Sequence, residues 1–446
     1  MSKYDKYRKL DINWLNELPY EWEVNRLKNV LKEPLKYGAN EPAVDDNRDN
    51  PRYIRITDFA ENGNLNDDTF KSLNFEAAKQ YLLKNGDILF ARSGATVGKT
   101  FQFKNYSGLA CYAGYLIKAR VNTKHILSDF LNYYTKSISY EEWKKNIFIQ
   151  ATIQNISAEK YNNLELPIPS IQEQYNITIY LDTQTSAIDK KIYLLETKIA
   201  DYKELSRSLI NEAVCKGLNK EVALKDSGIE WIGEIPKHWQ VKRLKDVGYL
   251  YSGLSGKTGE HFNQEVSDNS QHYIPFTNIA NNKYINHEDL HTVLMDENER
   301  QNKVKKNDLF FLMSSEGFAD IGKSALLIED VKDTYLNSFC KGYRIKKKTV
   351  VPKYLNYLLN SPAFRDKFIV QGKGFTRINL KMEKVSDFEF IIPPVEEQTA
   401  IAEHLDKKTT TIDAIVANIK LQIDSLKELR KTLINDVVTG KLKVTE

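Results

Sequence analysis

The sequence has little of what marks a secreted, membrane-spanning or zinc-binding protein. It contains 3 cysteines in 446 residues, an odd number without Cys-x-x-Cys spacing, so neither a disulfide framework nor a structural zinc site is predicted. It has no apolar run long enough to cross a bilayer, and no basic-then-apolar leader at its N-terminus. We therefore expect a cytoplasmic protein that binds no metal.

The chain also lacks a strong excess of one charge. Its formal net charge of +4 is too small to establish nucleic-acid binding, because many other proteins carry such a surface. The local distribution says more: between Phe101 and Gln150, seven basic residues stand against three acidic ones and alternate with tyrosines. This pattern suits a phosphate-facing surface, and an ordinary solvated face accounts for it equally well.

What the chain does have is an internal duplication. Residues 15–30 (LNELPYEWEVNRLKNV) recur 217 positions later as residues 232–247 (IGEIPKHWQVKRLKDV), and residues 168–218 recur 224 positions later as residues 392–442. The period is too long for a solenoid, whose units run about 20 to 50 residues. The sequence therefore predicts two related globular segments, the second longer by about seven residues.

The duplication predicts an alternation of globular and helical parts. We expect a first globular segment over residues 1–169, a helix over 170–218, a linker and second globular segment over 219–393, and a second helix with a tail over 394–446. Prolines stand just before each helix and a glycine near each end, as helix boundaries prefer. The globular segments are called the first head and the second head.

The two helical segments carry a heptad pattern of apolar residues. The predicted seam residues of the first segment are Leu181, Ile188, Ile192, Leu195, Ile199, Tyr202 and Leu209. Those of the second segment are Leu405, Ile412, Val416, Ile419, Ile423, Leu426 and Leu433. Matched seams on two long helices of one chain favour an intramolecular coiled coil, whereas the alternative is that each helix packs only on its own head.

We expect the two helices to pair antiparallel, because a parallel pair would bring both heads to one end. An antiparallel pair would place the heads at opposite ends, related by a pseudo-two-fold axis. A helix of about 40 residues is about 60 Å long, which is comparable to about 18 base pairs of DNA. The helices are therefore expected to act as a ruler between the heads.

Within the heads, apolar and aromatic runs bounded by glycine and asparagine predict strands over residues 53–59, 87–91, 273–279 and 308–312. The stretches that start at Phe130 and Tyr354 have the spacing of half-buried helices. The heads are therefore expected to be mixed α/β (α+β) domains in tandem duplicate.

Three short motifs imitate catalytic sites. Residues 94–100 resemble a phosphate-binding loop but have three residues between the glycines where the motif needs four. Residues 287–291 spell His-Glu-x-x-His, yet their flanks look extended rather than helical. Residues 392–395 (IPPV) lack the polar and aromatic ends of the tetrapeptide with which adenine methyltransferases hold a flipped base. The sequence therefore favours a non-catalytic chain.

Taken together, the motifs resemble the specificity subunits of Type I restriction-modification systems. The resemblance spans nearly the whole chain and rests on the duplicated Trp-x-x-x-(Ile/Leu)-Pro-x-x-Trp element, the Lys-Asn-Gly-Asp strand and the duplicated Ile-Pro-x-x-x-Glu-Gln stretch. These lie at Trp14–Trp22 and Trp231–Trp239, at Lys84–Asp87, and at Ile168–Gln174 and Ile392–Gln398.

The resemblance implies a subunit with two target recognition domains, each contacting one half of a bipartite, asymmetric DNA sequence. It implies two methylation subunits as partners, and restriction subunits in the full complex. S-adenosylmethionine, ATP and Mg²⁺ are then expected on the partner subunits, with no cofactor bound by this chain. Other readings stay open: a specificity subunit of another multisubunit restriction class, or a protein scaffold that does not bind DNA.

The candidate DNA-binding residues lie on loops that match between the heads. They are polar side chains able to contact base edges or phosphates, and Arg377 is the strongest single candidate because it stands in a polar loop, GKGFTRINL, that enters a strand. In the first head they are Arg92, Ser93, Thr96, Lys99, Thr152, Gln154 and Asn155. In the second head they are Ser314, Ser315, Lys323, Lys373, Thr376, Arg377 and Asn379.

Overall fold

The computed structural model describes residues 2–43, 45–60, 63–94, 96–149, 155–263, 267–296, 299–374 and 377–444. The chain forms two compact units. Unit 1 comprises residues 1–196 and 420–446, and unit 2 comprises residues 197–419. Each unit therefore contains one head together with part of both long helices.

The first head is built on a four-stranded antiparallel sheet in the order β4-β9-β6-β7. A parallel pair β5-β8 and the antiparallel pairs β1-β2 and β3-β10 complete it. The strands are β1 (Tyr7–Lys9), β2 (Glu17–Pro19), β3 (Glu23–Arg26), β4 (Lys36–Tyr37), β5 (Arg52–Ile54), β6 (Asp87–Ala91), β7 (Thr100–Phe103), β8 (Ala110–Tyr112), β9 (Leu116–Ala119) and β10 (Glu165–Ile168). The α-helices are α1 (Phe75–Ala78), α2 (Ser128–Tyr134), α3 (Ile138–Ile149) and α4 (Ala158–Asn162).

Strand β6 is buried on both faces, which explains why its sequence is a continuous apolar run. Ile88 and Phe90 point into the core shared with α2, while Leu89 and Ala91 point into a second core that includes Phe101. The alternation follows from the two-residue period of a strand. A one-residue slip would exchange these two sets of side chains, so the register is well specified.

The second head repeats this topology. Its central sheet has the order β14-β21-β17-β19, the parallel pair is β15-β20, and β16 joins the outer side of β15. The strands are β11 (Leu224–Asp226), β12 (Glu234–Pro236), β13 (Gln240–Arg243), β14 (Gly248–Ser252), β15 (Ser270–Ile274), β16 (His291–Leu294), β17 (Leu309–Leu312), β18 (Ser314–Ser315), β19 (Ser324–Leu326), β20 (Thr334–Leu336), β21 (Cys340–Ile345), β22 (Ile378–Asn379) and β23 (Glu389–Ile392). The α-helices are α6 (Leu244–Val247), α7 (Phe276–Asn281), α8 (Pro352–Asn360), α9 (Pro362–Gln371) and α10 (Met382–Ser386).

Short 3-10 turns η1 to η6 complete the two heads. They are η1 (Leu27–Val30), η2 (Ile56–Asp58), η3 (Asp67–Thr69), η4 (Lys79–Tyr81), η5 (Gly259–His261) and η6 (His287–Asp289). The mixed α/β character expected of both heads is thereby confirmed. Strand β16 corresponds to a shorter feature of the first head, the antiparallel bridge of Arg52 in β5 with Ser72.

Two of the four predicted strands are too long. The strand expected over residues 53–59 ends at Ile54, because the buried carboxylate of Asp58 accepts a hydrogen bond from the Arg55 backbone and pairs with its side chain, which turns the chain into η2. The strand expected over residues 273–279 ends at Ile274, because Pro275 removes a ladder donor and opens α7.

Two long helices follow the heads. Helix α5 spans Ile171–Lys216 and helix α11 spans Val395–Val438. Gly217 and Gly440 stand just beyond their ends with positive φ angles of 77° and 73°, a conformation that glycine adopts at no steric cost. The fourteen seam residues all lie on these helices, and each is buried or half-buried.

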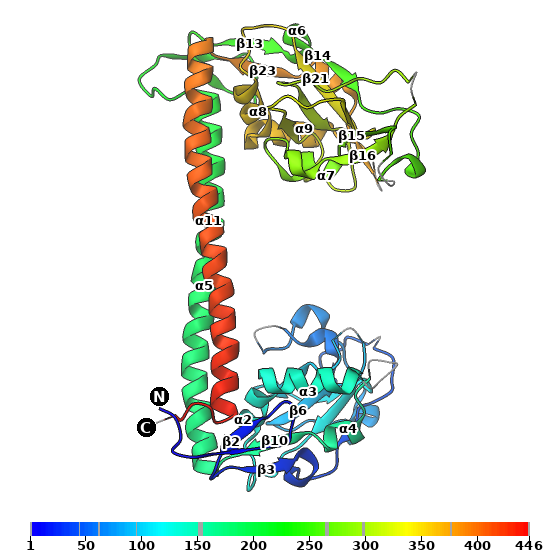
Figure 1. The fold of residues 1–446 in the computed structure, drawn as a ribbon, viewed down its shortest axis with the longest axis vertical. Helices are drawn as coiled ribbons and strands as arrows, with labels where there is room; N and C mark the ends of the chain where they lie inside the picture. Colours follow the sequence, from blue (N-terminus) through cyan, green and yellow to red (C-terminus); the bar gives the residue numbers. More distant parts are fainter. Residues whose placement is uncertain are drawn as a thin grey trace. The chain divides into compact units, whose positions relative to one another are not determined.

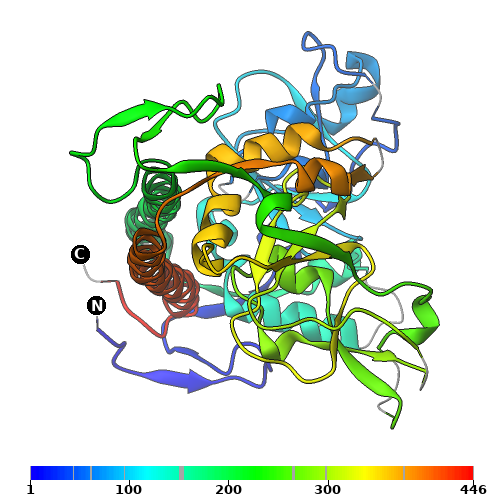
Figure 2. The ribbon, with the colours of Figure 1, turned by 90° about the horizontal axis from the view of Figure 1, so that it is seen from above.

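Within each unit the two helices run antiparallel, as predicted, and lie side by side (Figures 1 and 2). In unit 1, Ile177 and Leu181 near the start of α5 share a core with Ile434 and Val437 near the end of α11. In unit 2, Val214 near the end of α5 shares a core with residues 401–405 near the start of α11. Asp189 of α5 also pairs with Arg430 of α11 at 2.9 Å.

The Glu-Gln pair of the repeated motif attaches each helix to its head. Glu173 accepts a hydrogen bond from the indole of Trp22 at 3.0 Å, and Glu397 accepts one from Trp239 at 3.1 Å. The neighbouring Gln174 is fully buried and binds Leu127 N, His125 O and Pro169 O. Gln398 is fully buried too, with Val351 N, Thr349 O and Pro393 O as its partners.

The far end of each helix is attached to the other head. In unit 1, Asn435 of α11 accepts a hydrogen bond from Ser139 N of the first head at 3.1 Å. In unit 2, Asn211 of α5 accepts one from Ala363 N of the second head at 3.3 Å. Each head is therefore held by the start of its own helix and the end of the other. The alternative, in which each helix packs only on its own head, is excluded.

Candidate nucleic-acid interface

In the first head, the candidate residues gather where β6 leaves the central sheet. The chain runs on from β6 through Arg92 and Ser93 into a tight turn and returns as β7. Ser93 forms an antiparallel bridge with Asn155, and the carbonyl of Arg92 accepts a hydrogen bond from Ile156 N at 2.9 Å. Arg92, Ser93 and Asn155, far apart in sequence, therefore lie next to one another.

The second head has the same strand pair at the same place. Ser314 and Ser315 form β18 and pair with Asn379 and Ile378 of β22, and Leu380 N donates to the carbonyl of Met313 at 2.8 Å. Lys373 bridges to Asn379 on the other side. We call these two arrangements, Ser93 with Asn155 and β18 with β22, the serine–asparagine strand pairs. The two strand pairs are equivalent. Five candidates of the second head lie in or next to its strand pair: Ser314, Ser315, Lys373, Arg377 and Asn379.

Two predicted lysines bind the protein's own backbone. Lys99 Nζ donates to the carbonyl of Phe59 at 3.1 Å. Lys323 Nζ donates to the carbonyl of Ala280 at 3.0 Å and pairs with Asp320. In this structure both lysines tie the turn to the loop beside it. Thr96 is exposed in the turn, and Thr152, Gln154 and Thr376 lie outside the described residues.

Two aromatic residues lie at these strand pairs that the sequence did not predict. The Arg92 guanidinium lies over the ring of Tyr37, 4.8 Å from its centre, and that of Arg377 lies over the ring of Phe339 at 4.3 Å. Both rings are largely exposed. No local pattern in the sequence marks them, because each ring comes from a strand or turn remote from its arginine.

The phosphate-loop look-alike does not present its backbone amides to a ligand. The amides of Val97, Gly98 and Lys99 donate to the carbonyls of Gly94, Ala91 and Thr96, which closes a tight hairpin turn. Within the His-Glu-x-x-His sequence, His287 lies in η6 whereas His291 begins β16. The two imidazoles therefore do not share the face of a helix, which that zinc motif requires. In the described part of the chain, no group of three or more potential metal ligands occurs.

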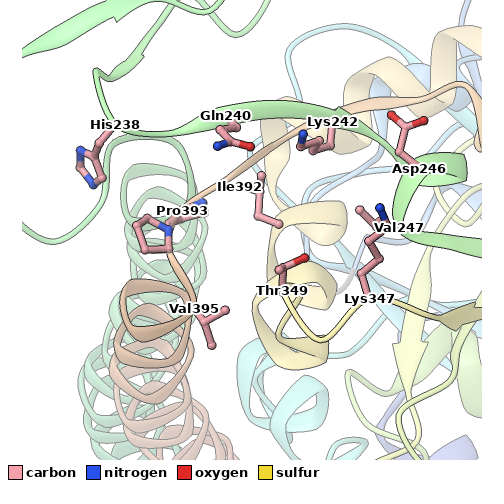
Figure 3. Close-up of a pocket in the computed structure, with 11 residues that line it drawn as sticks. His238, Gln240, Lys242, Asp246, Val247, Lys347, Thr349, Ile392, Pro393 and Val395 are labelled. Carbon is pink, nitrogen blue, oxygen red and sulfur yellow. The ribbon is translucent and has the colours of Figure 1, made fainter.

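The third look-alike lies at a pocket of about 540 Å³ on the second head (Figure 3). Pro393 and Val395 line it where the chain enters α11, together with His238, Lys242 and Lys347. His238 pairs with Glu397 at 2.7 Å. The pocket therefore flanks the attachment of head to helix, on elements other than the serine–asparagine strand pair.

The comparisons with known proteins agree with this architecture. The family model described as the Type I restriction modification DNA specificity domain matches residues 19–197 and again residues 236–425. The chain belongs to this family. Each of the two matches covers most of a head and continues into a long helix, so the duplication seen in the sequence is a duplication of the specificity domain.

Relatives of this family match the chain over nearly its full length. The specificity subunit of the Type I restriction enzyme MjaVIII from Methanocaldococcus jannaschii is 22% identical, over 96% of this chain and 94% of that protein. The putative MjaX specificity subunit of the same organism is 25% identical, over 99% of this chain and 98% of that protein. The chain is thus a specificity subunit, the non-catalytic component of its restriction-modification system, whose substrate is DNA.

Solved structures share the fold. A chain from a study of assembly and conformational transition of the type I R-M system superimposes with a TM-score of 0.72, covering 95% of this chain and 99% of that chain at 15% identity. The HsdS subunit from Thermoanaerobacter tengcongensis superimposes with a TM-score of 0.55, covering 95% and 98% at 15% identity. Among the described residues, no helix is long and apolar enough to span a membrane.

Proposed function

We propose that each head reads one half of a bipartite, asymmetric DNA target through its serine–asparagine strand pair. The observation that carries this proposal is that both heads have the same strand pair in the same place but different side chains around it. Arg92 precedes the pair in the first head, where the second head has Met313. Equivalent surfaces with different side chains are what two unlike half-sites require, since side chains read base edges.

The candidate residues divide into two roles under this proposal. Arg92, Asn155, Arg377 and Asn379 have the side chains that form paired hydrogen bonds with base edges, guanine for arginine and adenine for asparagine. Lys373 and Thr96 are exposed and suit contacts with phosphate, which set the register of the protein on the duplex. Arg377→Ala should weaken specific binding by about 1 to 3 kcal/mol, and unchanged affinity and preference would remove it from the site.

The antiparallel helices are proposed to fix the distance and facing of the two half-sites, with the heads related by a pseudo-two-fold axis. Insertion of one heptad into each of α5 and α11 adds about 10 Å, which is about three base pairs of spacer. The inserted protein should bind a target with a longer spacer and unchanged half-sites. Loss of binding to every spacer length would instead indicate that the helices do not set the separation.

The partners follow from the family. We propose that two methylation subunits bind along the helical segments, that restriction subunits join the full complex in the cytoplasm, and that S-adenosylmethionine, ATP and Mg²⁺ act on those partners. Specificity subunits of another multisubunit restriction class would have fused nuclease-methylase partners instead. Purification of the chain with its genomic neighbours and identification of the bound subunits separates these two cases.

The decisive test is a domain exchange. Residues 1–169 are replaced by the equivalent head of another family member, and methylated adenines are mapped in DNA from cells that also contain the methylation subunit. We expect one half-site to change while the other half-site and the spacer persist. A scaffold that does not bind DNA predicts no sequence-dependent methylation, and in mobility-shift assays no salt-sensitive, sequence-dependent binding.

A further inference from the structure

Each head carries one arginine whose guanidinium lies on an exposed aromatic ring beside the serine–asparagine strand pair. Tyr37, the ring under Arg92, is 41% exposed, and Phe339, the ring under Arg377, is 46% exposed. The hydroxyl of Tyr37 accepts a hydrogen bond from Ala158 N at 3.0 Å, which fixes the ring against the start of α4. Both guanidinium groups are thus supported on one side, and Arg377 is exposed whereas Arg92 is half-buried.

Within the described part of the chain, these two arginines lack the carboxylate acceptors that two other arginines of the same heads have. Arg120 binds Asp87 through two nitrogens at 2.8 and 2.7 Å, and Arg344 binds Asp308 in the same way. Among the described residues, by contrast, none accepts a hydrogen bond from the guanidinium of Arg92 or Arg377, and Arg92 Nε is buried without a partner. A buried donor without a partner costs free energy, so the position is suited to a ligand that supplies one.

The amide oxygen of Asn155 is a second buried atom at the same place, and it too has no partner among the residues that the structure describes. Asn155 faces Ser93, the residue after Arg92, across the strand pair. A donor and an acceptor that lie unpaired within one strand pair match the edge of a base pair, which presents both kinds of group in the major groove. A phosphate offers acceptors only and would leave the asparagine oxygen unsatisfied.

The two stacks are not copies of one another. Arg92 stands where the second head has Met313, which is 6% exposed, and it precedes the serine of the strand pair. Arg377 stands two residues before the asparagine, directly before the opposite strand β22. The scaffold is duplicated, but the free guanidinium enters from a different strand in each head. A feature that differs between two otherwise equivalent surfaces is the kind of feature that distinguishes two half-sites.

We propose that Arg92 and Arg377 are specificity-determining residues that each read one guanine, with Tyr37 and Phe339 as positioning residues that hold the guanidinium planes. The inference rests on the proposed function and deepens it. Guanine O6 and N7 are two acceptors matched by the two donors of a planar guanidinium. An aromatic face under the guanidinium fixes its plane before binding, which lowers the entropy lost when the contact forms. Each half-site therefore contains a G·C pair whose identity depends on one of these arginines.

The test uses the full chain with its methylation subunit. The target is first obtained from the mapped methylated adenines of the wild type, and duplexes are then made in which each G·C pair is replaced in turn. Arg92→Lys keeps the charge but loses the planar pair of donors, so discrimination at one G·C pair of one half-site should fall about 10- to 100-fold. Arg377→Lys should do the same in the other half-site only.

The aromatic residues supply the matched controls. Tyr37→Leu removes the supporting face and should lower discrimination at the same G·C pair as Arg92→Lys, by about 3- to 10-fold. Tyr37→Phe keeps the ring and loses only the hydroxyl that accepts from Ala158 N, so its loss of discrimination should be smaller than that of Tyr37→Leu. Phe339→Leu and Phe339→Tyr form the corresponding pair in the second head, where Phe339→Tyr should leave discrimination at wild-type level. Unaltered reading of the opposite half-site by each variant shows that the protein has folded.

Three results overturn the inference. In the first, Arg92→Lys or Arg377→Lys weakens binding to all duplexes equally and makes the affinity less dependent on salt. That result identifies a phosphate contact. Another is discrimination unchanged in both lysine variants. In the third, the wild-type complex shows no sequence-dependent binding. That result overturns the proposed function as well, and the measurement on the wild type alone tells it apart from the first two.

Discussion

In each head, an aspartate of the long helix that follows accepts hydrogen bonds from the head. The two aspartates are equivalent, 224 positions apart, but they accept from different numbers of donors. In unit 1, Asp182 of α5 accepts a hydrogen bond from Tyr133 of the first head. In unit 2, Asp406 of α11 accepts hydrogen bonds from Tyr357 and Tyr284 and from the ammonium groups of Lys283 and Lys353. The tyrosine-to-aspartate contact is common to both heads, and the second head adds three donors.

The difference comes from the residues around the shared contact. Where the second head has Lys353, the first head has Asp129, which pairs with Lys104 and accepts from Gln102 instead. Burial by itself would raise the pKa of Asp406, but the hydrogen bonds from Lys353, Tyr284 and Tyr357 and the charge of Lys283 outweigh burial and lower it to about 2. Duplication therefore preserved the attachment, and divergence strengthened it on one side.

The largest effect is expected where the two heads agree. Gln174→Ala and Gln398→Ala each leave a buried backbone N–H and two carbonyls without their partner, so each should lower the stability of its own unit by about 3 kcal/mol. Hydrogen exchange, read at the amides of the central strands β6 and β17, measures the two losses. Losses that differ by more than about 1 kcal/mol would show that the shared attachment has diverged as well.

A smaller and unequal effect is expected at the carboxylates. Asp406→Ala removes one acceptor from each of two lysines and two tyrosines. It should destabilise unit 2 by about 2 kcal/mol, whereas Asp182→Ala should cost unit 1 about 1 kcal/mol. Urea unfolding followed by hydrogen exchange in each unit gives the values. The surface carboxylate Glu403 provides the control, because Glu403→Ala should change stability by less than about 0.5 kcal/mol. Equal losses at Asp182 and Asp406 would contradict the comparison.

The decrease in the free energy of unfolding at acid pH should depend on Asp406. A carboxyl group whose pKa is lowered by folding contributes stability that is present above its unfolded pKa and lost as the pH falls through its folded pKa. The advantage of the wild type over Asp406→Asn should therefore be constant above about pH 4 and shrink by about 1 kcal/mol on approach to pH 2, after allowance for solvent screening. Chemical unfolding of both proteins across this range measures the difference, and a constant gap down to pH 2 would contradict it.

The smallest effect is expected from one peripheral donor. The side chain of Lys353 is 44% exposed, and it is one of four donors to Asp406. Lys353→Met keeps the apolar stem and should cost about 0.5 kcal/mol, because exposed ion pairs contribute little. A loss as large as that of Asp406→Ala, measured in the same unfolding experiment, would mean that this lysine alone holds the second head.

Periodic apolar patterns in the sequence predicted the long helices and a central strand. The heptad seam predicted two long helices that pair with one another, because an apolar period of 3.5 residues is typical of helices that pair along a seam. Their antiparallel direction was predicted from the position of a head before each helix. The continuous apolar run of β6 predicted a buried strand at its observed bounds. Predictions failed where a side chain or a proline redirects the backbone, at Asp58 and at Pro275, since the strand signal there continues past the turn.

The candidate surface could be predicted only in part. Loops matched between the heads led to Arg92, Ser93 and Asn155 and to Ser314 and Asn379, and these residues do meet across strand pairs. Lys99 and Lys323 were selected for their charge, but that charge is directed at backbone carbonyls of neighbouring loops. Tyr37 and Phe339 were missed because stacking is a contact between remote segments.

The sequence by itself determined the duplication, the two long helices and the polar loops at equivalent positions, since periodicity and repetition are properties of the chain order. Only the tertiary structure decided which helix end holds which head, which lysines are already bound and which arginines keep free donors. Those outcomes depend on groups that are far apart in sequence and meet only after folding. Their hydrogen bonds are therefore set by packing geometry rather than by residue type.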